Sequence, residues 1–204
     1  MGRPQLHDEH TRRSLLDAAE SLVEREGLEA LSVRGVAGSA ATTTRAVYSL
    51  FGSREGLLDA LGARAFDHLA AALDAQPLRS EPRSGLIDAG ADAFRRLATE
   101  RPGLLRAAIQ RAKAGPGTLT HRSGQRASAR LLVRLERLEE AGLLPHRDPH
   151  EAAQEFHALC EGLASLQLRG ALPPDQSERV WRAALTTMVD GLAVDTDAVS
   201  GATG

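Results

Sequence analysis

The chain has 204 residues, of which 42% are hydrophobic and 25% are charged, and its formal net charge at pH 7 is −2. This composition is typical of a globular protein of one or two small domains, and no run of residues is apolar enough to cross a membrane. The N-terminal residues MGRPQLHDEHTRR have no apolar signal-peptide core, so we expect a cytoplasmic protein.

Helical periodicity extends over nearly the whole chain and predicts an all-α protein. In the first predicted helix, at about residues 8–26, apolar side chains recur at three- and four-residue spacing, and Gly27 follows as a C-cap. Ser32 opens a short second helix, and Thr43 caps a short third one.

A longer helix is expected to begin at Ser53 and to end near Ala75. The segment QPLRSEPRSG then interrupts the helical pattern with two prolines and a glycine. Beyond this segment we predict helices at about residues 84–100, 102–113, 122–142, 149–170 and 174–194.

Residues 33–52, VRGVAGSAATTTRAVYSLFG, have the pattern of two short helices joined by a tight turn. The small and apolar residues that such a pair needs at its contact are Val36, Ala37, Ala40, Val47 and Leu50. A DNA-binding helix-turn-helix lays its second helix in the major groove, with its N-terminal residues against the base edges. Here that helix begins with Thr43, Thr44 and Arg45.

Residues 11–61 resemble the N-terminal domain of TetR-family transcriptional regulators. The shared features are an arginine and apolar residues in the first helix, an alanine pair, a glycine before the second helix, and a closing tyrosine, phenylalanine, basic residue, glutamate and leucine pair. The resemblance implies an all-helical homodimer that binds operator DNA through this domain and releases it when a small molecule enters the C-terminal domain. The segment EFHALCEGLASLQLRG is similar to the tryptophan-histidine-glycine stretch of one C-terminal subgroup, although Phe156 and Glu161 replace the tryptophan and the histidine.

This resemblance divides the chain into three parts. Residues 1–52 form the three-helix DNA-binding domain, residues 53–194 form a helical ligand-binding and dimerisation domain, and residues 195–204 form a flexible tail.

Two positions depart from the family pattern. The family usually has a glycine and then an apolar residue in the turn, where this chain has Ala41 and Thr42. If residue 41 is left-handed, an alanine there costs on the order of 1 kcal/mol, so either the turn is altered or the domain is slightly destabilised. The usual lysine after Ser53 is Arg54, which keeps the charge and adds a planar fork for phosphate.

The distribution of charge indicates DNA binding better than its total does. Residues 1–64 contain eight arginines and nine acidic residues, so their net charge gives no support for nucleic-acid binding. Residues 30–54, in contrast, contain Arg34, Arg45 and Arg54 and no acidic residue. A local positive patch of this kind is sufficient for phosphate contacts.

Roles in DNA binding follow from side-chain chemistry and from position in the motif. We expect Thr44 and Arg45 to reach base edges, because a threonine methyl suits thymine and an arginine fork suits guanine. The residues expected to contact phosphates are Ser32, Thr43, Tyr48 and Arg54. Arg3 is assigned to a flexible arm that enters the minor groove.

The C-terminal helices carry apolar stripes, which line a core more often than a ligand pocket, and both interpretations stay open. The candidate pocket residues are Phe66, Phe94, Leu97, Leu105, Ile109, Leu131, Leu135, Phe156, His157 and Cys160. The last two predicted helices have apolar residues on more than one face, which favours a four-helix dimer interface. The candidate interface residues are Leu159, Leu163, Leu166, Val180, Leu185, Met188 and Leu192.

Other chemistry has little support in the sequence. His150, His157 and Glu161 share a helical face with a spacing that can hold a metal, but such a triple also arises on a surface or pocket helix, and we assign no metal or cofactor. A lone cysteine excludes an intramolecular disulfide, and no catalytic motif stands out, so we expect no enzyme.

Two functions remain as hypotheses. One is a ligand-responsive transcriptional repressor that binds a pseudo-palindromic operator. The other is a helical small-molecule-binding protein whose Ala41-Thr42 turn has weakened or abolished DNA binding.

Overall fold

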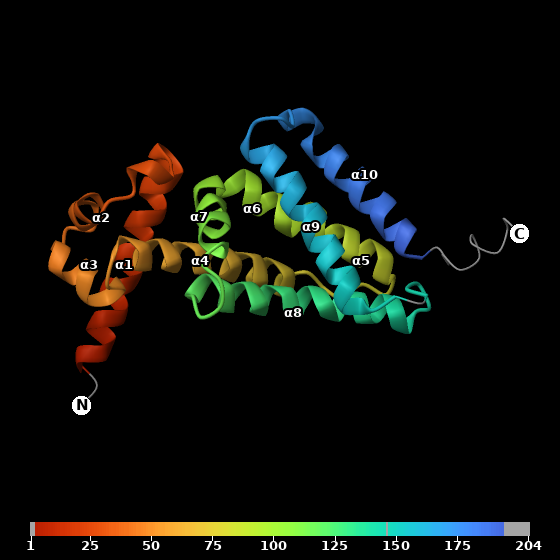
Figure 1. The fold of residues 1–204 in the computed structure, drawn as a ribbon, viewed down its shortest axis with the longest axis horizontal. Coiled ribbons are helices and arrows are strands. Elements are labelled where there is room, and N and C mark those ends of the chain that lie inside the picture. The colour runs from red at the N-terminus through yellow and green to blue at the C-terminus, as the bar shows by residue number, and fades with distance from the viewer. Residues whose placement is uncertain (1–2, 146, 194–204) are drawn as a thin grey trace, which may run out of the picture. The chain divides into compact units, whose positions relative to one another are not determined.

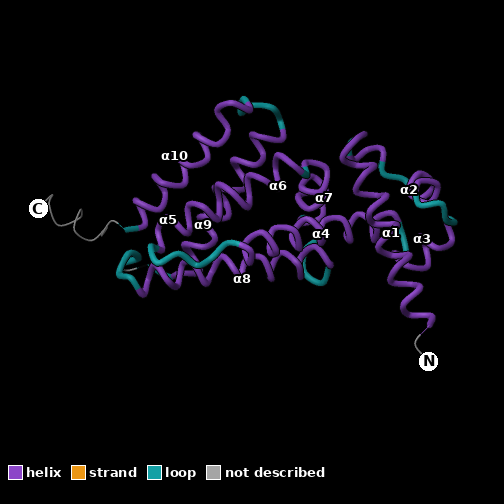
Figure 2. The backbone as a smooth tube through the Cα atoms, turned by 180° about the vertical axis from the view of Figure 1, so that it is seen from behind, coloured by secondary structure: helices purple, strands orange, loops and turns teal. Residues whose placement is uncertain are grey.

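The structure, a computed structural model, describes residues 3–145 and 147–193 and, within them, the side chains from residue 8 onward. The described part of the chain consists of helices and connecting loops and has no strand, as Figures 1 and 2 show, which confirms the all-α prediction. No helix in these residues is long and apolar enough to span a membrane. The predicted tail at 195–204 lies outside the described residues.

The chain divides into two compact units that do not follow its sequence order. The first unit comprises Met1–His68 and Arg101–Gln125, and the second comprises Leu69–Glu100 and Arg126–Gly204. These units reflect packing, whereas the predicted division after residue 52 was a division by function. That functional division therefore stays a prediction.

The first unit contains the helix-turn-helix. Its elements are α1 (Arg3–Glu26), η1 (Leu28–Ala30), α2 (Val33–Ser39), α3 (Thr44–Phe51), the first part of α4 (Arg54–Ala75), α7 (Pro102–Ala112) and the start of α8 (Leu119–Glu140). Helix α1 begins about five residues before its predicted start, at Arg3. Pro4 is compatible with this start because the first amides of a helix need no partner within it.

Side-chain caps fix where the short helices begin, as the sequence predicted. Ser32 accepts a hydrogen bond from the Gly35 amide at 3.1 Å, and Thr43 accepts one from the Ala46 amide at 3.2 Å. Ser53 caps α4 in the same way. The buried core beneath these helices comprises Leu15, Ala19, Leu22, Val23, Val36, Ala37, Val47, Phe51, Leu57 and Leu61.

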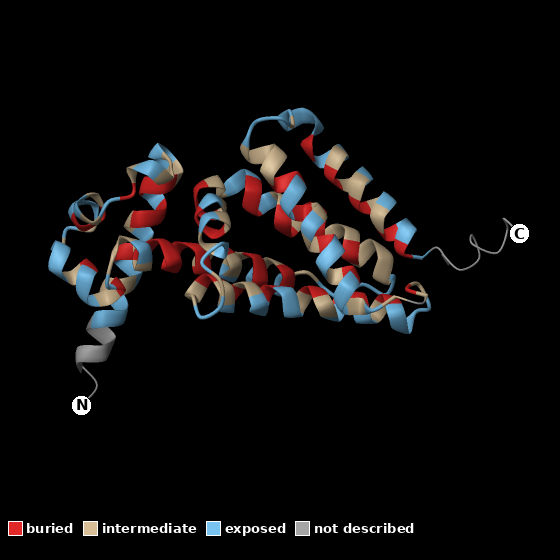
Figure 3. Ribbon diagram, viewed as in Figure 1, coloured by how far each residue is buried: buried red, intermediate tan, exposed pale blue. Residues whose placement is uncertain are grey.

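The second unit is built around α9 (Pro149–Leu168) and α10 (Pro174–Leu192). The predicted helix at 84–100 is continuous but changes its winding, since α5 (Pro82–Asp88) passes into the π-helix η2 (Ala89–Phe94) and then into α6 (Arg95–Glu100). Gly90 permits a close approach at this point: a Cβ there would lie 2.6 Å from Leu185 Cδ1 and 2.9 Å from Phe156 Cζ. Figure 3 shows that buried residues run along the inner faces of these helices.

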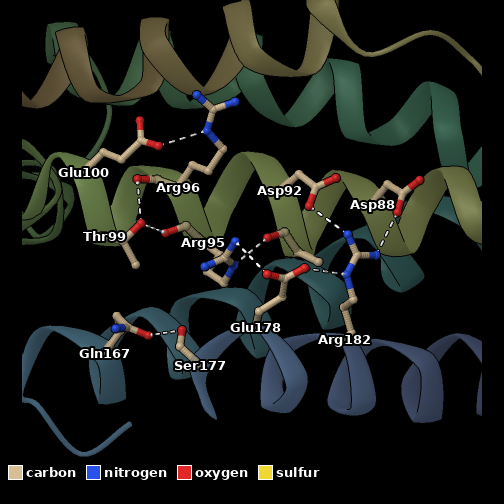
Figure 4. Close-up of polar contacts among 11 residues, drawn as sticks. Asp88, Asp92, Arg95, Arg96, Thr99, Glu100, Gln167, Ser177, Glu178 and Arg182 are labelled. Carbon is tan, nitrogen blue, oxygen red and sulfur yellow. Dashed lines mark hydrogen bonds and ion pairs between the residues drawn. The ribbon is translucent and has the colours of Figure 1, made fainter. Parts of the chain in front are cut away.

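An ionic network joins α10 to the α5–η2 segment (Figure 4). Arg182 lies 2.9 Å from a carboxylate oxygen of Asp88 and 2.9 Å from one of Asp92. Glu178, one turn earlier in α10, pairs with Arg182 at 3.4 Å and with Arg95 at 3.6 Å. These contacts lie at the edge of the second unit and fix the register of α10 against η2.

Candidate nucleic-acid interface

The turn between α2 and α3 is closed by two hydrogen bonds at the end of α2. The Ala41 amide donates to the Gly38 carbonyl at 3.1 Å, and the Thr42 amide donates to the Ala37 carbonyl at 2.9 Å. This pair is the Schellman arrangement, which requires a left-handed residue at its centre. Ala41 has a φ of 50° and is the one non-glycine residue with a positive φ in the described ranges. Residue 41 is therefore left-handed, and the turn forms in spite of the alanine.

The outer face of α3 is polar and accessible. Thr43, Thr44 and Arg45 are exposed at its N-terminus, and Tyr48 follows one turn later with 54% of its surface exposed. Val47, on the opposite face, is completely buried. Arg45 makes no hydrogen bond or ion pair with any residue that the structure describes, so its guanidinium is available to a partner outside the chain.

A second available arginine lies on α2. Ser32 is exposed, and because its oxygen already accepts from the Gly35 amide, its hydroxyl proton remains for an external acceptor. Arg34, two residues later, is also exposed and has no partner among the described residues. The sequence places Arg34 in the basic segment, but no individual role was predicted for it. Its position in the first turn of α2 is the signal that would have identified it.

Arg54 has a structural contact that the sequence did not predict. Its Nε donates to the Leu31 carbonyl at 2.8 Å, and the side chain is half-buried. This bond joins the start of α4 to the residue that precedes the Ser32 cap. The two terminal nitrogens of Arg54 have no described partner, so a phosphate contact by this residue stays a prediction.

Arg3 cannot be assigned a contact, because its side chain lies outside the described residues. Arg3 is the first residue of α1, whereas the sequence predicted a flexible arm at this position.

Acidic residues on α1 are largely neutralised by partners within the first unit. Arg64 pairs with Asp17 and, at 2.9 Å, with Glu20, which also pairs with Arg101. Their charges therefore offset one another locally, whereas Arg34 on α2 and Arg45 on α3 are exposed and have no acidic partner among the described residues.

Glu24 joins α1 to α7 through the main chain. Its two carboxylate oxygens accept hydrogen bonds from the amides of Gly103 and Leu104, each at 2.9 Å. These are the first amides of α7, which have no partner within the helix and favour a nearby negative charge. A carboxylate of α1 thus serves as the N-terminal cap of a helix distant in sequence.

Asp59 likewise caps the N-terminus of α8. It accepts hydrogen bonds from the Leu119 amide at 2.8 Å and from the Thr120 amide at 3.1 Å. Burial opposes ionisation of Asp59, but these hydrogen bonds, one more from the Thr120 hydroxyl and the charge of Arg111 outweigh it and lower its pKa. The ionised carboxylate is therefore the form that the fold stabilises.

The candidate pocket residues fall in both units, and the structure brings only some of them together. The Phe94 ring lies 6.5 Å from that of Phe156 and 5.9 Å from that of His157, centroid to centroid. Phe156 is fully buried against Gly90, which leaves no room for a ligand at that contact. Phe66, Leu105 and Ile109 belong to the first unit.

Cys160 is completely buried, and burial raises the pKa of its thiol well above the ordinary value. This supports its interpretation as a small apolar core residue. Among the described residues, no group of three or more histidine, cysteine, aspartate or glutamate side chains is placed to hold a metal. His157 and Glu161 form a simple pair at 3.8 Å.

Three of the seven candidate dimer residues are already buried within a single chain. Leu163, Leu185 and Leu192 have at most 5% of their surface exposed there, so they contribute to the core of the second unit. The dimer interface itself stays a prediction. The candidates that keep partial exposure are Leu159 and Leu166 on α9 and Val180 and Met188 on α10.

Two family models match the chain. Bacterial regulatory proteins of the tetR family match residues 15–61, and the tetracyclin repressor-like C-terminal domain matches residues 87–188. No curated protein sequence matches it.

Solved structures share the fold over most of the chain. A protein of unknown function from Rhodococcus sp. RHA1 is 30% identical, over 90% of this chain and 96% of that one, with a TM-score of 0.77. The TetR family transcriptional regulator PfmR from Thermus thermophilus is 23% identical, over 86% and 96% of the two chains, with a TM-score of 0.65. RolR in complex with the ligand resorcinol is 21% identical, over 93% and 95%, with a TM-score of 0.68.

Proposed function

The chain belongs to the tetR family of bacterial regulatory proteins, and from this membership we propose that it is a homodimeric repressor that binds a pseudo-palindromic operator and is released by a small molecule. The observation that carries the proposal is the outer face of α3. There the exposed residues are polar or basic and Arg45 has no described partner, while the opposite face is buried.

In this proposal different side chains of the helix-turn-helix contact the bases and the phosphates. Thr44 and Arg45 read base edges in the major groove, since both side chains leave the first turn of α3 on its exposed face. The residues proposed to contact phosphates are Ser32, Thr43, Tyr48 and Arg54. Arg34 adds a further cation beside them.

Two copies of the chain are needed for tight binding. One recognition helix offers few contacts, and a twofold dimer doubles them on a palindromic site. We assign the interface to the partly exposed apolar residues of α9 and α10, namely Leu159, Leu166, Val180 and Met188. Sedimentation at micromolar concentration tests this, since a monomer there would contradict it.

The effector is proposed to be an apolar or amphipathic small molecule that binds among the helices between about residues 60 and 170. It lowers operator affinity by favouring a wider spacing of the two reading heads, and the coupling must be reciprocal because DNA would weaken effector binding by the same factor. RolR binds resorcinol. At 21% identity, the similarity between RolR and this chain is one of fold. We therefore propose only that the effector is a small organic molecule.

The alternative, a small-molecule-binding protein without DNA binding, depended on a disrupted turn. The turn is closed by the left-handed Ala41 and its two flanking hydrogen bonds, although the alanine is strained, and a closed turn supports the regulator. The regulator is therefore the better supported of the two functions.

DNA selection tests the proposal directly. The full-length protein is incubated with a pool of random duplexes and, separately, with the DNA that flanks its own gene. Recovery of a sequence with twofold symmetry, bound more tightly than a shuffled duplex, is the expected result. Equal affinity for all sequences over a salt series would exclude an operator-specific regulator.

A further inference from the structure

A side chain of α1 holds the last turn of α3. Arg12 donates from Nη1 to the Leu50 carbonyl at 3.0 Å, and its guanidinium carbon lies 4.7 Å from the centroid of the Phe51 ring. Arg12 and Leu50 are half-buried, and Phe51 is 9% exposed. One guanidinium thus makes a hydrogen bond and a cation–π contact with consecutive residues of the helix that carries Arg45.

The contact places the positive charge of Arg12 at the C-terminal end of α3. The last carbonyls of a helix lack partners within it and carry partial negative charge, which a nearby cation stabilises. Helix α3 has no basic residue of its own in its last turn, so Arg12 supplies that cation from α1. The Gly52 amide satisfies the Tyr48 carbonyl at 2.9 Å, which leaves the Leu50 carbonyl to the arginine.

This contact is directional in a way that the apolar core is not. Helix α3 packs mainly on α2 and makes a smaller contact with α1. Buried apolar residues such as Val47 hold the helices together, and the hydrophobic effect that buries them has no preferred direction. A hydrogen bond has a narrow range of distance and angle. The contacts of Arg12 therefore add a directional restraint between α1 and α3.

We infer that Arg12 is a positioning residue for base reading: it holds α3 at the angle at which Thr44 and Arg45 meet base edges. The inference rests on the proposed function, since it requires that α3 read DNA. Bidentate contacts to bases weaken steeply when the donor moves, whereas flexible side chains follow a phosphate over a larger range. Loss of Arg12 should therefore reduce sequence discrimination and leave charge-dependent binding intact.

The experiment compares two substitutions of Arg12 with a neighbouring control. Arg12→Met keeps an unbranched apolar stem over Phe51 and removes the donor and the charge. Arg12→Lys keeps the charge but lacks the planar fork that bonds and stacks at once. Arg13→Met is the control, because Arg13 is adjacent and exposed and has no described partner. Each full-length protein is titrated over a salt series with a duplex selected by the wild type and with a shuffled duplex of equal length.

For Arg12→Met we expect affinity for the selected duplex to fall about tenfold per half-site, the scale of one weakened bidentate contact. Affinity for the shuffled duplex and the slope of log affinity against log salt should stay as in the wild type. The affinity of Arg12→Lys for the selected duplex should lie between those of the wild type and Arg12→Met, and Arg13→Met should discriminate between the duplexes as the wild type does. Circular dichroism gives the folded fraction, and Arg12→Lys carries the test if the methionine variant is unfolded.

Two results would overturn the inference. If Arg12→Met weakens both duplexes alike and makes the salt slope shallower, Arg12 contacts a phosphate and does not position α3. If discrimination is unchanged in both Arg12 variants, the angle of α3 does not depend on this residue. A wild-type protein that discriminates between no duplexes would instead refute the proposed function, so the two failures are distinguishable.

Discussion

Replacing Ala41 by glycine should stabilise the protein. The φ of 50° at Ala41 places its Cβ near the following carbonyl oxygen, which costs an L-residue about 1–2 kcal/mol. Glycine removes that cost but adds conformational entropy to the unfolded chain, which returns about 0.4–1 kcal/mol. The net gain in the free energy of unfolding therefore lies between about 0 and 1.6 kcal/mol, with a central value of about 0.8 kcal/mol. The turn itself should not change, because the amides of Ala41 and Thr42 keep their acceptors.

Urea and thermal denaturation of the full chain measure this difference. In a chain of this size a gain of about 1 kcal/mol raises the midpoint of thermal unfolding by about 2–4 °C. Gly142→Ala is the matched control, since Gly142 has a φ of 71° and no atom within 4 Å of the Cβ position. It closes the end of α8 with the same pair of hydrogen bonds as Ala41, from its own amide to the Glu139 carbonyl and from the Leu143 amide to the Leu138 carbonyl, so an alanine there should lower stability by about 1 kcal/mol. A destabilised Ala41→Gly variant beside a destabilised Gly142→Ala variant would refute the reasoning, because strain at residue 41 would then not exist.

Three further predictions concern DNA binding, acid stability and packing. Arg45→Ala should reduce the free energy of binding to the selected operator by about 1–3 kcal/mol per half-site and flatten the preference at one base pair. Arg54→Ala should lower the affinity for all duplexes and also lower the stability of the protein, because it removes the hydrogen bond to the Leu31 carbonyl. Binding titrations with single-base variants decide this, and an unchanged base preference in Arg45→Ala would contradict it. The folded pKa of Asp59 lies below its ordinary value of 3.8, so the ionised carboxylate stabilises the fold above pH 3.8 and loses this effect as the pH falls through the folded pKa. The difference in unfolding free energy between wild type and Asp59→Asn should therefore be full at about pH 6 and shrink below about pH 4. A difference that does not change with pH would contradict the assignment. Gly90→Ala should destabilise by about 1–3 kcal/mol through the clash with the second unit's core, whereas Gly162→Ala, with nothing near its Cβ, should be neutral or stabilising in the same urea titration.

Local features of the helix-turn-helix were predictable from sequence because each depends on neighbours within four residues. The caps at Ser32, Thr43 and Ser53 need only a hydroxyl ahead of a helical pattern, and these predictions are confirmed. The sequence raised a left-handed residue 41 only as a condition, and the structure shows that the condition holds.

Contacts between distant residues were not predictable in this way. Arg12 and Arg54 donate to carbonyls 38 and 23 positions away, and a carbonyl has no signature in the sequence. Apolar periodicity showed that Leu185 is buried but not whether its own chain or a partner covers it, and the structure shows that the chain does. The π-helix η2 contains Gly90, whose close neighbours Phe156 and Leu185 come from α9 and α10 and are distant in the sequence.

The cap that Glu24 provides for α7 affects how this DNA-binding region can be exchanged with that of a relative. The two acceptor oxygens of Glu24 lie 79 and 80 positions from the amides of Gly103 and Leu104 that they bind. Gly103 also sits against α1 so closely that a Cβ would lie 2.7 Å from the Val23 carbonyl oxygen. A chimaera joined at residue 52 would carry a foreign α1 against the native α7, and we expect it to lose stability unless the donor supplies a carboxylate at position 24. A stable exchange of the DNA-binding region should therefore transfer α1 and α7 together, although residues of the second unit separate them in the sequence.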